Sequence, residues 1–89
     1  MLVKQATVRK MYSAGNKKAK DLLKAGVPLQ SLTTGDNRKQ IESAIWTAFK
    51  LSDDRSSGHD ADHKVTDFLE LLDEEINCYG KFTSIVPGG

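Results

Sequence analysis

Apolar side chains recur at three- and four-residue spacing in three stretches of the chain, which is the pattern of helices buried along one side. The first stripe comprises Val8, Met11, Tyr12, Ala19, Leu22 and Leu23. The second comprises Ile41, Ala44, Ile45, Ala48 and Phe49, with Trp46 beside it. The third and most regular stripe comprises Val65, Phe68, Leu69, Leu72, Ile76 and Tyr79. These stripes predict helices over residues 6–25, 37–51 and 61–79.

Turn-forming residues separate the three stripes. The Gly-Val-Pro sequence at residues 26–28 ends the first helix, because glycine accepts a left-handed cap and proline cannot continue the hydrogen-bond ladder. A side chain that can cap a helix precedes each later stripe: Asp36 or Asn37 before the second, and Asp60 or Asp62 before the third. We therefore expect the helices to be joined by loops rather than to merge.

Gly15 lies on the first apolar stripe, where glycine costs about 1 kcal/mol of helix propensity. Such a residue marks a kink, a break between two helices or the close approach of a neighbour. Residues 80–89 form a tail whose apolar side chains can pack back on the helices or form an edge strand: Phe82, Ile85 and Val86. The prediction is a single all-α domain over residues 1–89, a small three-helix hairpin or bundle with a kinked first helix and a short C-terminal tail.

The composition is that of a globular protein, with 38% hydrophobic and 28% charged residues. No apolar run approaches the roughly 20 residues of a membrane-spanning helix, and the N-terminus lacks the apolar segment of a secretory signal. Cys78 is the single cysteine, in keeping with a reducing compartment. We expect a cytoplasmic protein without membrane contact. Because 89 residues bury only a modest core, we also expect self-association into a homo-oligomer.

The net charge of +1 conceals two halves of opposite sign. Residues 1–26 hold seven Lys and Arg against Asp21, whereas residues 51–89 hold nine acidic residues against three basic ones. One side of the first helix carries Lys10, Lys17, Lys20 and Lys24. Such halves can pair within a protomer, pair between protomers, or leave the basic half to bind an anion.

The residues around Gly15 combine an aromatic ring, hydrogen-bonding groups and cations, which are the groups that bind bases and phosphates. The candidate ligand-binding residues are Tyr12, Ser13, Asn16, Lys17, Lys18 and Lys20. The same lysines also fit the solvated side of a bundle helix. Tyr12 lies on the apolar stripe, so its ring fits the core as well as it fits a site.

Catalytic and metal-binding patterns are weak or missing. The sequence has no GxSxG, no CxxC and no glycine-rich phosphate loop, so we expect neither an enzyme nor a cofactor. His59 and His63 stand four residues apart, as two metal ligands on one helix face would. No third ligand is evident in the sequence, so we expect a solvated helix N-terminus there and keep the metal site as the weaker alternative.

Part of the chain resembles a known family. Tyr12, Ala14 and KAKDLL (Lys18–Leu23), followed by IESAIWTAFK (Ile41–Lys50), are similar in order and spacing to the helical hairpin of phage anti-CBASS and anti-Thoeris sponge proteins. The similarity covers about residues 12–50, roughly half of the chain. It implies a small α-helical homo-oligomer, hexameric in the anti-CBASS branch, which binds cyclic dinucleotides or trinucleotides in the host cytoplasm without cleaving them.

The resemblance also implies roles for the candidate residues. Tyr12 would stack on a base, Asn16 would hydrogen-bond to the ligand, and the three lysines at 17, 18 and 20 would contact phosphates. Two alternatives remain open from the residues themselves. One is a small basic nucleic-acid-binding or regulatory protein. The other is a phage inhibitor of a host protein that uses Trp46 and the apolar tail.

Overall fold

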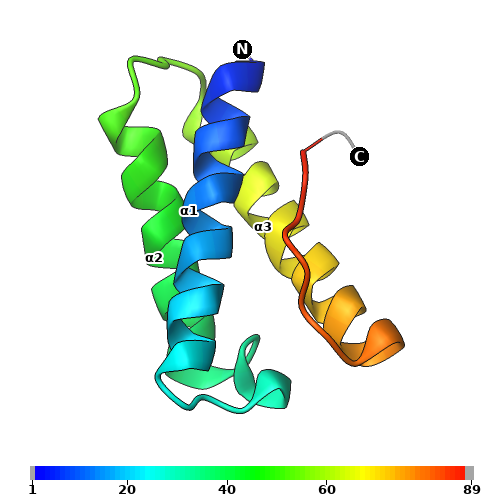
Figure 1. The fold of residues 1–89 in the computed structure, drawn as a ribbon. Helices are drawn as coiled ribbons and strands as arrows, with labels where there is room; N and C mark the ends of the chain where they lie inside the picture. The colour runs from blue at the N-terminus through cyan, green and yellow to red at the C-terminus, as the bar shows by residue number, and fades with distance from the viewer. Residues whose placement is uncertain (1, 88–89) are drawn as a thin grey trace.

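A computed structural model, which describes residues 2–87, shows three α-helices and an extended tail (Figure 1). The helices are α1 (Gln5–Lys24), α2 (Gly35–Leu51) and α3 (Gly58–Glu74). A short 3-10 turn, η1 (Leu29–Ser31), lies between α1 and α2, and a π-helical turn, η2 (Glu75–Tyr79), continues α3. Residues 2–87 contain no β-strand, so the prediction of an all-α, three-helix architecture is confirmed.

The helix ends differ by a few residues from the predicted ones. The chain leaves α1 through Gly26, whose φ of 97° is the left-handed conformation expected after a helix. Helix α2 begins at Gly35, after Thr34, so the predicted caps Asp36 and Asn37 lie inside its first turn. Helix α3 begins at Gly58, earlier than predicted, because the Ser57 hydroxyl accepts a hydrogen bond of 3.2 Å from a main-chain N–H in the first turn.

The three predicted apolar stripes meet in one core, except for Tyr79 at the end of the third stripe, which is 67% exposed. Helices α1 and α2 lie side by side and antiparallel, and α3 packs across them (Figure 1). The largest fully buried side chains come from all three helices and from the turn after η1: Met11, Leu32, Ile41, Ile45, Phe68, Leu69 and Leu72. Burial of these stripes is the main force that holds so short a chain together.

Gly15 is a point of close approach between α1 and α3. A methyl group at this position would lie 2.7 Å from Cζ of Phe68 and 3.0 Å from Cδ1 of Ile45, both shorter than ordinary contacts. Helix α1 continues through Gly15 without a break. Of the three predicted roles for this glycine, the structure shows close approach, because the Phe68 ring packs against the bare main chain.

The tail turns back at Gly80, which has a φ of 64°, and runs along α3 toward the N-terminal end of the molecule (Figure 1). Its Ile85 is buried, and its main chain is held by side chains instead of by a strand. The Glu75 carboxylate accepts hydrogen bonds of 2.8 Å from both the N–H and the hydroxyl of Thr83. The tail therefore packs on the bundle as an extended segment. The last two residues of the predicted tail, 88 and 89, lie outside the described residues.

Two carboxylates fix the start of α1 to the α2–α3 region. Asp54 accepts hydrogen bonds from the N–H groups of Lys4 at 2.8 Å and Ser56 at 2.9 Å. Asp60 accepts one from the N–H of Val3 at 2.6 Å. The hydrogen bond from the Lys4 N–H is the main cause that lowers the pKa of Asp54 to about 2, because it stabilises the ionised carboxylate.

Within residues 2–87, none of the helices combines the length and the hydropathy needed to cross a lipid bilayer.

Candidate functional site

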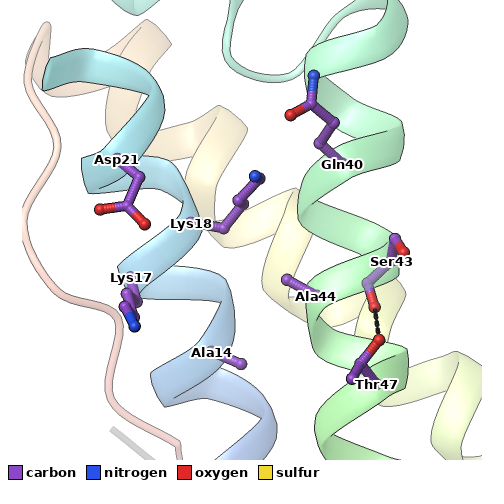
Figure 2. A pocket seen from close by; sticks show the side chains of 8 residues that line it. All are labelled: Ala14, Lys17, Lys18, Asp21, Gln40, Ser43, Ala44 and Thr47. Carbon is purple, nitrogen blue, oxygen red and sulfur yellow. Dashed lines mark hydrogen bonds between the residues drawn. The ribbon is translucent and has the colours of Figure 1, made fainter. Parts of the chain in front are cut away.

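A groove of about 440 Å³ runs between α1 and α2 and is the larger of two hollows that flank the lysines of α1. It is open to solvent along its length, and we call it the α1/α2 groove. Eight residues line it: Ala14, Lys17, Lys18, Asp21, Gln40, Ser43, Ala44 and Thr47. Figure 2 shows Ala14 and Ala44 pointing toward each other from the two helices, so small side chains form the floor.

Polar groups stand on both walls of this groove. Lys18 is half-buried and reaches from α1 toward α2, while Gln40 and Ser43 bring an amide and a hydroxyl from α2 (Figure 2). The Thr47 hydroxyl donates a hydrogen bond of 2.8 Å to the carbonyl of Ser43, so its proton is already used. Lys17 lies on the flank of α1 that is turned away from α2 (Figure 2).

The groove keeps a local excess of positive charge. Within residues 2–87, Arg38 forms an ion pair with Glu42 at 3.3 Å, and the His63 imidazole, which is charged only when protonated, lies 3.7 Å from Asp67. Neither pair involves a lysine of α1. Asp21 is the single carboxylate among the lining residues of the groove. The lysine charges of α1 are therefore available to an anion from outside.

A second hollow of about 370 Å³ lies on the other side of α1, between this helix and the tail. We call it the basic hollow. It is lined by Ser13, Asn16, Lys17, Lys20, Asp21, Lys24 and Ser84. Lys17 and Asp21 border both the groove and the basic hollow, so these two residues form the ridge between them.

Tyr12 lies in the core. Only 5% of its surface is exposed, and its ring meets the Phe68 ring edge to face, with centroids 5.3 Å apart. Burial, and secondly the charge of Asp67, raises the pKa of its phenol, because both disfavour the ionised form. The prediction that Tyr12 stacks on a base is wrong, because neither face of its ring is open to a ligand.

Asn16 borders the basic hollow, but its amide is already engaged. Its Nδ2 donates to the carbonyl of Ile85 and its Oδ1 accepts from the N–H of Ile85, both at 2.9 Å. In the structure this amide fixes the tail, and the role of Asn16 as a ligand contact stays a prediction. The remaining candidates divide between two hollows: Ser13 and Lys20 in one, Lys18 in the other, and Lys17 between them.

The α2 wall of the groove was not predicted from the sequence. Gln40, Ser43 and Thr47 are ordinary polar residues on the outer side of an amphipathic helix, and nothing in their type or spacing marks a site. The one usable signal was Ala44, a small residue on the apolar stripe, since a small side chain there leaves room between two packed helices.

The two histidines do not form a metal site with other residues. His59 and His63 are both exposed on the first turns of α3, and His63 lies beside Asp67. Among residues 2–87 no three His, Cys, Asp or Glu side chains are grouped so that they could hold a metal ion. The neighbouring Asp60 already accepts a hydrogen bond from the main chain of Val3.

No protein-family model, curated protein or solved structure matches the chain.

Proposed function

We propose that this protein is a non-catalytic binding protein that holds a small phosphate-bearing ligand in the α1/α2 groove. The observation that carries the proposal is Lys18, an ammonium group without an ion pair among residues 2–87, beside an amide and a hydroxyl over an alanine floor. A lysine supplies a mobile point charge for a phosphate, while Gln40 and Ser43 supply directional hydrogen bonds.

The size and openness of the groove set the kind of ligand. Its volume of about 440 Å³ falls within the range of small-molecule sites, and it is open along one side. Ala14 and Ala44 leave room for a flat ring to lie against the floor (Figure 2). A ligand larger than the groove can extend outward along the lysines of α1, where Lys17 stands at the edge.

Within this class, we propose cyclic dinucleotides or trinucleotides as the ligand, and sequestration of these signals from a CBASS-type anti-phage defence as the role. Support comes from the resemblance over residues 12–50, which spans all the residues that line the groove. Sequestration requires tight binding without bond cleavage, so a site built from lysine, amide and hydroxyl groups is sufficient. Because Tyr12 is buried, the bases must lie on the groove floor.

The test is thermal melting of the full chain with a panel of cyclic dinucleotides and trinucleotides, with linear dinucleotides as the comparison. A ligand at about a thousand times its dissociation constant adds about 4 kcal/mol to the free energy of unfolding. Lys18→Ala should abolish the shift. Lys39→Ala, an exposed lysine of the same hairpin outside the groove, is the matched control and should retain it. If no compound of the panel moves the transition, the proposed ligand class is wrong.

One feature favours a second candidate, a nucleic-acid-binding protein. The lysines of α1 continue past the groove to Lys20 and Lys24 in the basic hollow, which forms a longer basic strip than one small ligand needs. A nucleic acid would bind with an affinity that rises with strand length and falls steeply with salt, because each phosphate contact releases counterions. A small ligand would instead saturate at a fixed stoichiometry in the same titration.

A further inference from the structure

Exposed apolar side chains gather around one hollow on the side of the molecule that carries the tail. The large hydrophobic residues exposed in residues 2–87 are Leu2, Leu51, Leu71, Tyr79 and Val86. The last three line a single hollow of about 310 Å³ between the end of α3, η2 and the tail. Tyr79 and Val86 are each 67% exposed. We call this the acidic-apolar hollow, because Glu74 and Glu75 complete its lining together with Ser84 and Ile85.

The acidic-apolar hollow and the basic hollow are neighbours across the tail. Ser84 lines both of them, and the tail lies over α3 beside α1 (Figure 1). One face of the molecule therefore presents a basic strip on α1, then the tail, then an acidic and apolar strip on α3 and η2. The Glu75 carboxylate is held in place by Thr83, so Glu74 is the more mobile of the two carboxylates that can meet a cation.

We propose that this face binds a second copy of the chain and forms a two-fold symmetric dimer. A two-fold axis that runs along the tail, in the plane of the interface, places the basic hollow of each copy opposite the acidic-apolar hollow of the other. The two charge-complementary contacts then form together, since a face with adjacent strips of opposite sign is complementary to itself in this arrangement.

The chemistry of the two strips fits this arrangement. The aliphatic stems of Lys20 and Lys24 can cover Leu71 and the Tyr79 ring, while their ammonium groups reach the ring face or Glu74 of the other copy. Val86, at the tail, meets its own counterpart near the axis. Each copy thereby buries apolar surface that is exposed to water in the monomer.

The dimer surface shares Lys17 and Asp21 with the proposed ligand site but not the residues that carry the ligand proposal. Lys18, Gln40 and Ser43 line the α1/α2 groove and neither of the two hollows that meet in the dimer. The two proposals can therefore be tested independently. A chain that stays monomeric does not contradict the ligand proposal, and a ligand panel without melting shifts does not contradict the dimer. Lys18→Ala serves as an internal control, because it should impair ligand binding without changing the association state.

Sedimentation velocity of the full chain over about a hundredfold range of concentration tests the proposal. The native chain should pass from monomer to dimer. The charge reversals Lys20→Glu with Lys24→Glu in one variant, and Glu74→Lys in another, should each weaken self-association about tenfold or more, because like charges then face each other. An equimolar mixture of these two variants should dimerise again, since both contacts in the mixed dimer are once more between opposite charges.

Two apolar substitutions complete the test. Val86→Asp should prevent dimerisation by placing two carboxylates near the axis. Leu51→Asp, at an even more exposed residue outside both hollows, should leave the dimer intact. Circular dichroism confirms that each variant is folded. A native chain that stays monomeric at the highest concentration overturns the proposal. So does a dimer that survives both charge reversals, or a mixture of the reversed variants that stays monomeric.

Discussion

The side-chain amide of Asn16 hydrogen-bonds both main-chain polar groups of Ile85, with Nδ2 to the carbonyl oxygen and Oδ1 to the N–H each at 2.9 Å. The amide thereby pairs with the main chain of the tail in the way that the main chain of a neighbouring strand does in a sheet. Because Ile85 is also buried, the middle of α1 and the end of the chain form one packed unit. This contact also forms the boundary between the basic hollow and the acidic-apolar hollow.

Replacement of Asn16 by alanine should release the tail. The substitution leaves both polar groups of Ile85 without their partner, which costs about 1–3 kcal/mol when the group is buried. Hydrogen exchange at the Ile85 amide should accelerate, and trypsin should cut more readily after the exposed Lys81. Asn77→Ala, at an exposed asparagine, is the control and should change neither rate. Unchanged exchange at Ile85 in Asn16→Ala would show that the tail is held by its apolar contacts alone.

Gly15→Ala should destabilise the fold although alanine is the better helix former. The gain in helix propensity is about 1 kcal/mol, whereas overpacking a core typically costs about 1–3 kcal/mol. The added methyl group would lie within 3.0 Å of both the Phe68 ring and Ile45, so the ring must move. Urea unfolding should show a lower free energy of unfolding, and a second change, Phe68→Leu, should recover part of the loss.

Gly58→Ala is the matched control for the preceding substitution. Gly58 has a negative φ, lies in the first turn of α3, and has open space where a Cβ would be built. Its replacement should leave stability unchanged or raise it slightly, through a less flexible unfolded chain. If Gly15→Ala is as benign as Gly58→Ala, the close approach of Phe68 to α1 is not a constraint on the fold.

The architecture could be predicted from the sequence because each helix buries a regular stripe. Phe68 and Ile45 stand at the expected buried positions, and the chain leaves α1 and η2 through the glycines Gly26 and Gly80. Tyr12 shows the limit of this reasoning, because a ring at the border of a stripe fits either the core or a site. Helical periodicity alone cannot decide between them, since the answer depends on where Phe68 of another helix points.

The site itself was less predictable than the fold. The lysines were found because charge is visible in the sequence, but Ser43 of α2 became part of the groove only through the packing of α1 on α2. The sequence suggested Asn16 as a ligand contact and gave no sign of the tail contact that the structure shows. Its partner is the main chain of Ile85, far along the sequence, and a main-chain group leaves no signature in residue types.

Stability should fall in acid partly through Asp54. Its pKa is lowered to about 2 in the folded state, mainly by the hydrogen bond from the Lys4 N–H, so the folded chain binds a proton there less readily than the unfolded chain does. Its contribution is therefore present above the unfolded value of about 3.8 and is lost as the pH falls toward 2. In the Asp54→Asn variant, the free energy of unfolding should depend less on pH between these two values than it does in the native chain. Asp53→Asn, at the exposed neighbouring carboxylate, should keep the native dependence.

Tyr12 should make stability depend on pH in the opposite direction, and this dependence tests its place in the core. Burial raises the pKa of its phenol above 10.0, so the unfolded chain loses this proton first and stability should fall as the pH rises past that value. Tyr12→Phe keeps the ring packed on Phe68 and should remove this alkaline loss, whereas Tyr79→Phe, at an exposed tyrosine, should not.

Tyr12→Ala should instead lower the free energy of unfolding by about 3–5 kcal/mol, as truncation of a buried aromatic ring does. A variant that is so destabilised would bind no ligand for a trivial reason, so its failure to bind says nothing about stacking. Tyr12→Phe is the informative variant in the ligand panel, because it removes only the hydroxyl. Ligand-induced melting shifts equal to those of the native chain are expected from a core residue. If a fully folded Tyr12→Phe variant shows no ligand-induced melting shift, the phenol hydroxyl takes part in ligand binding.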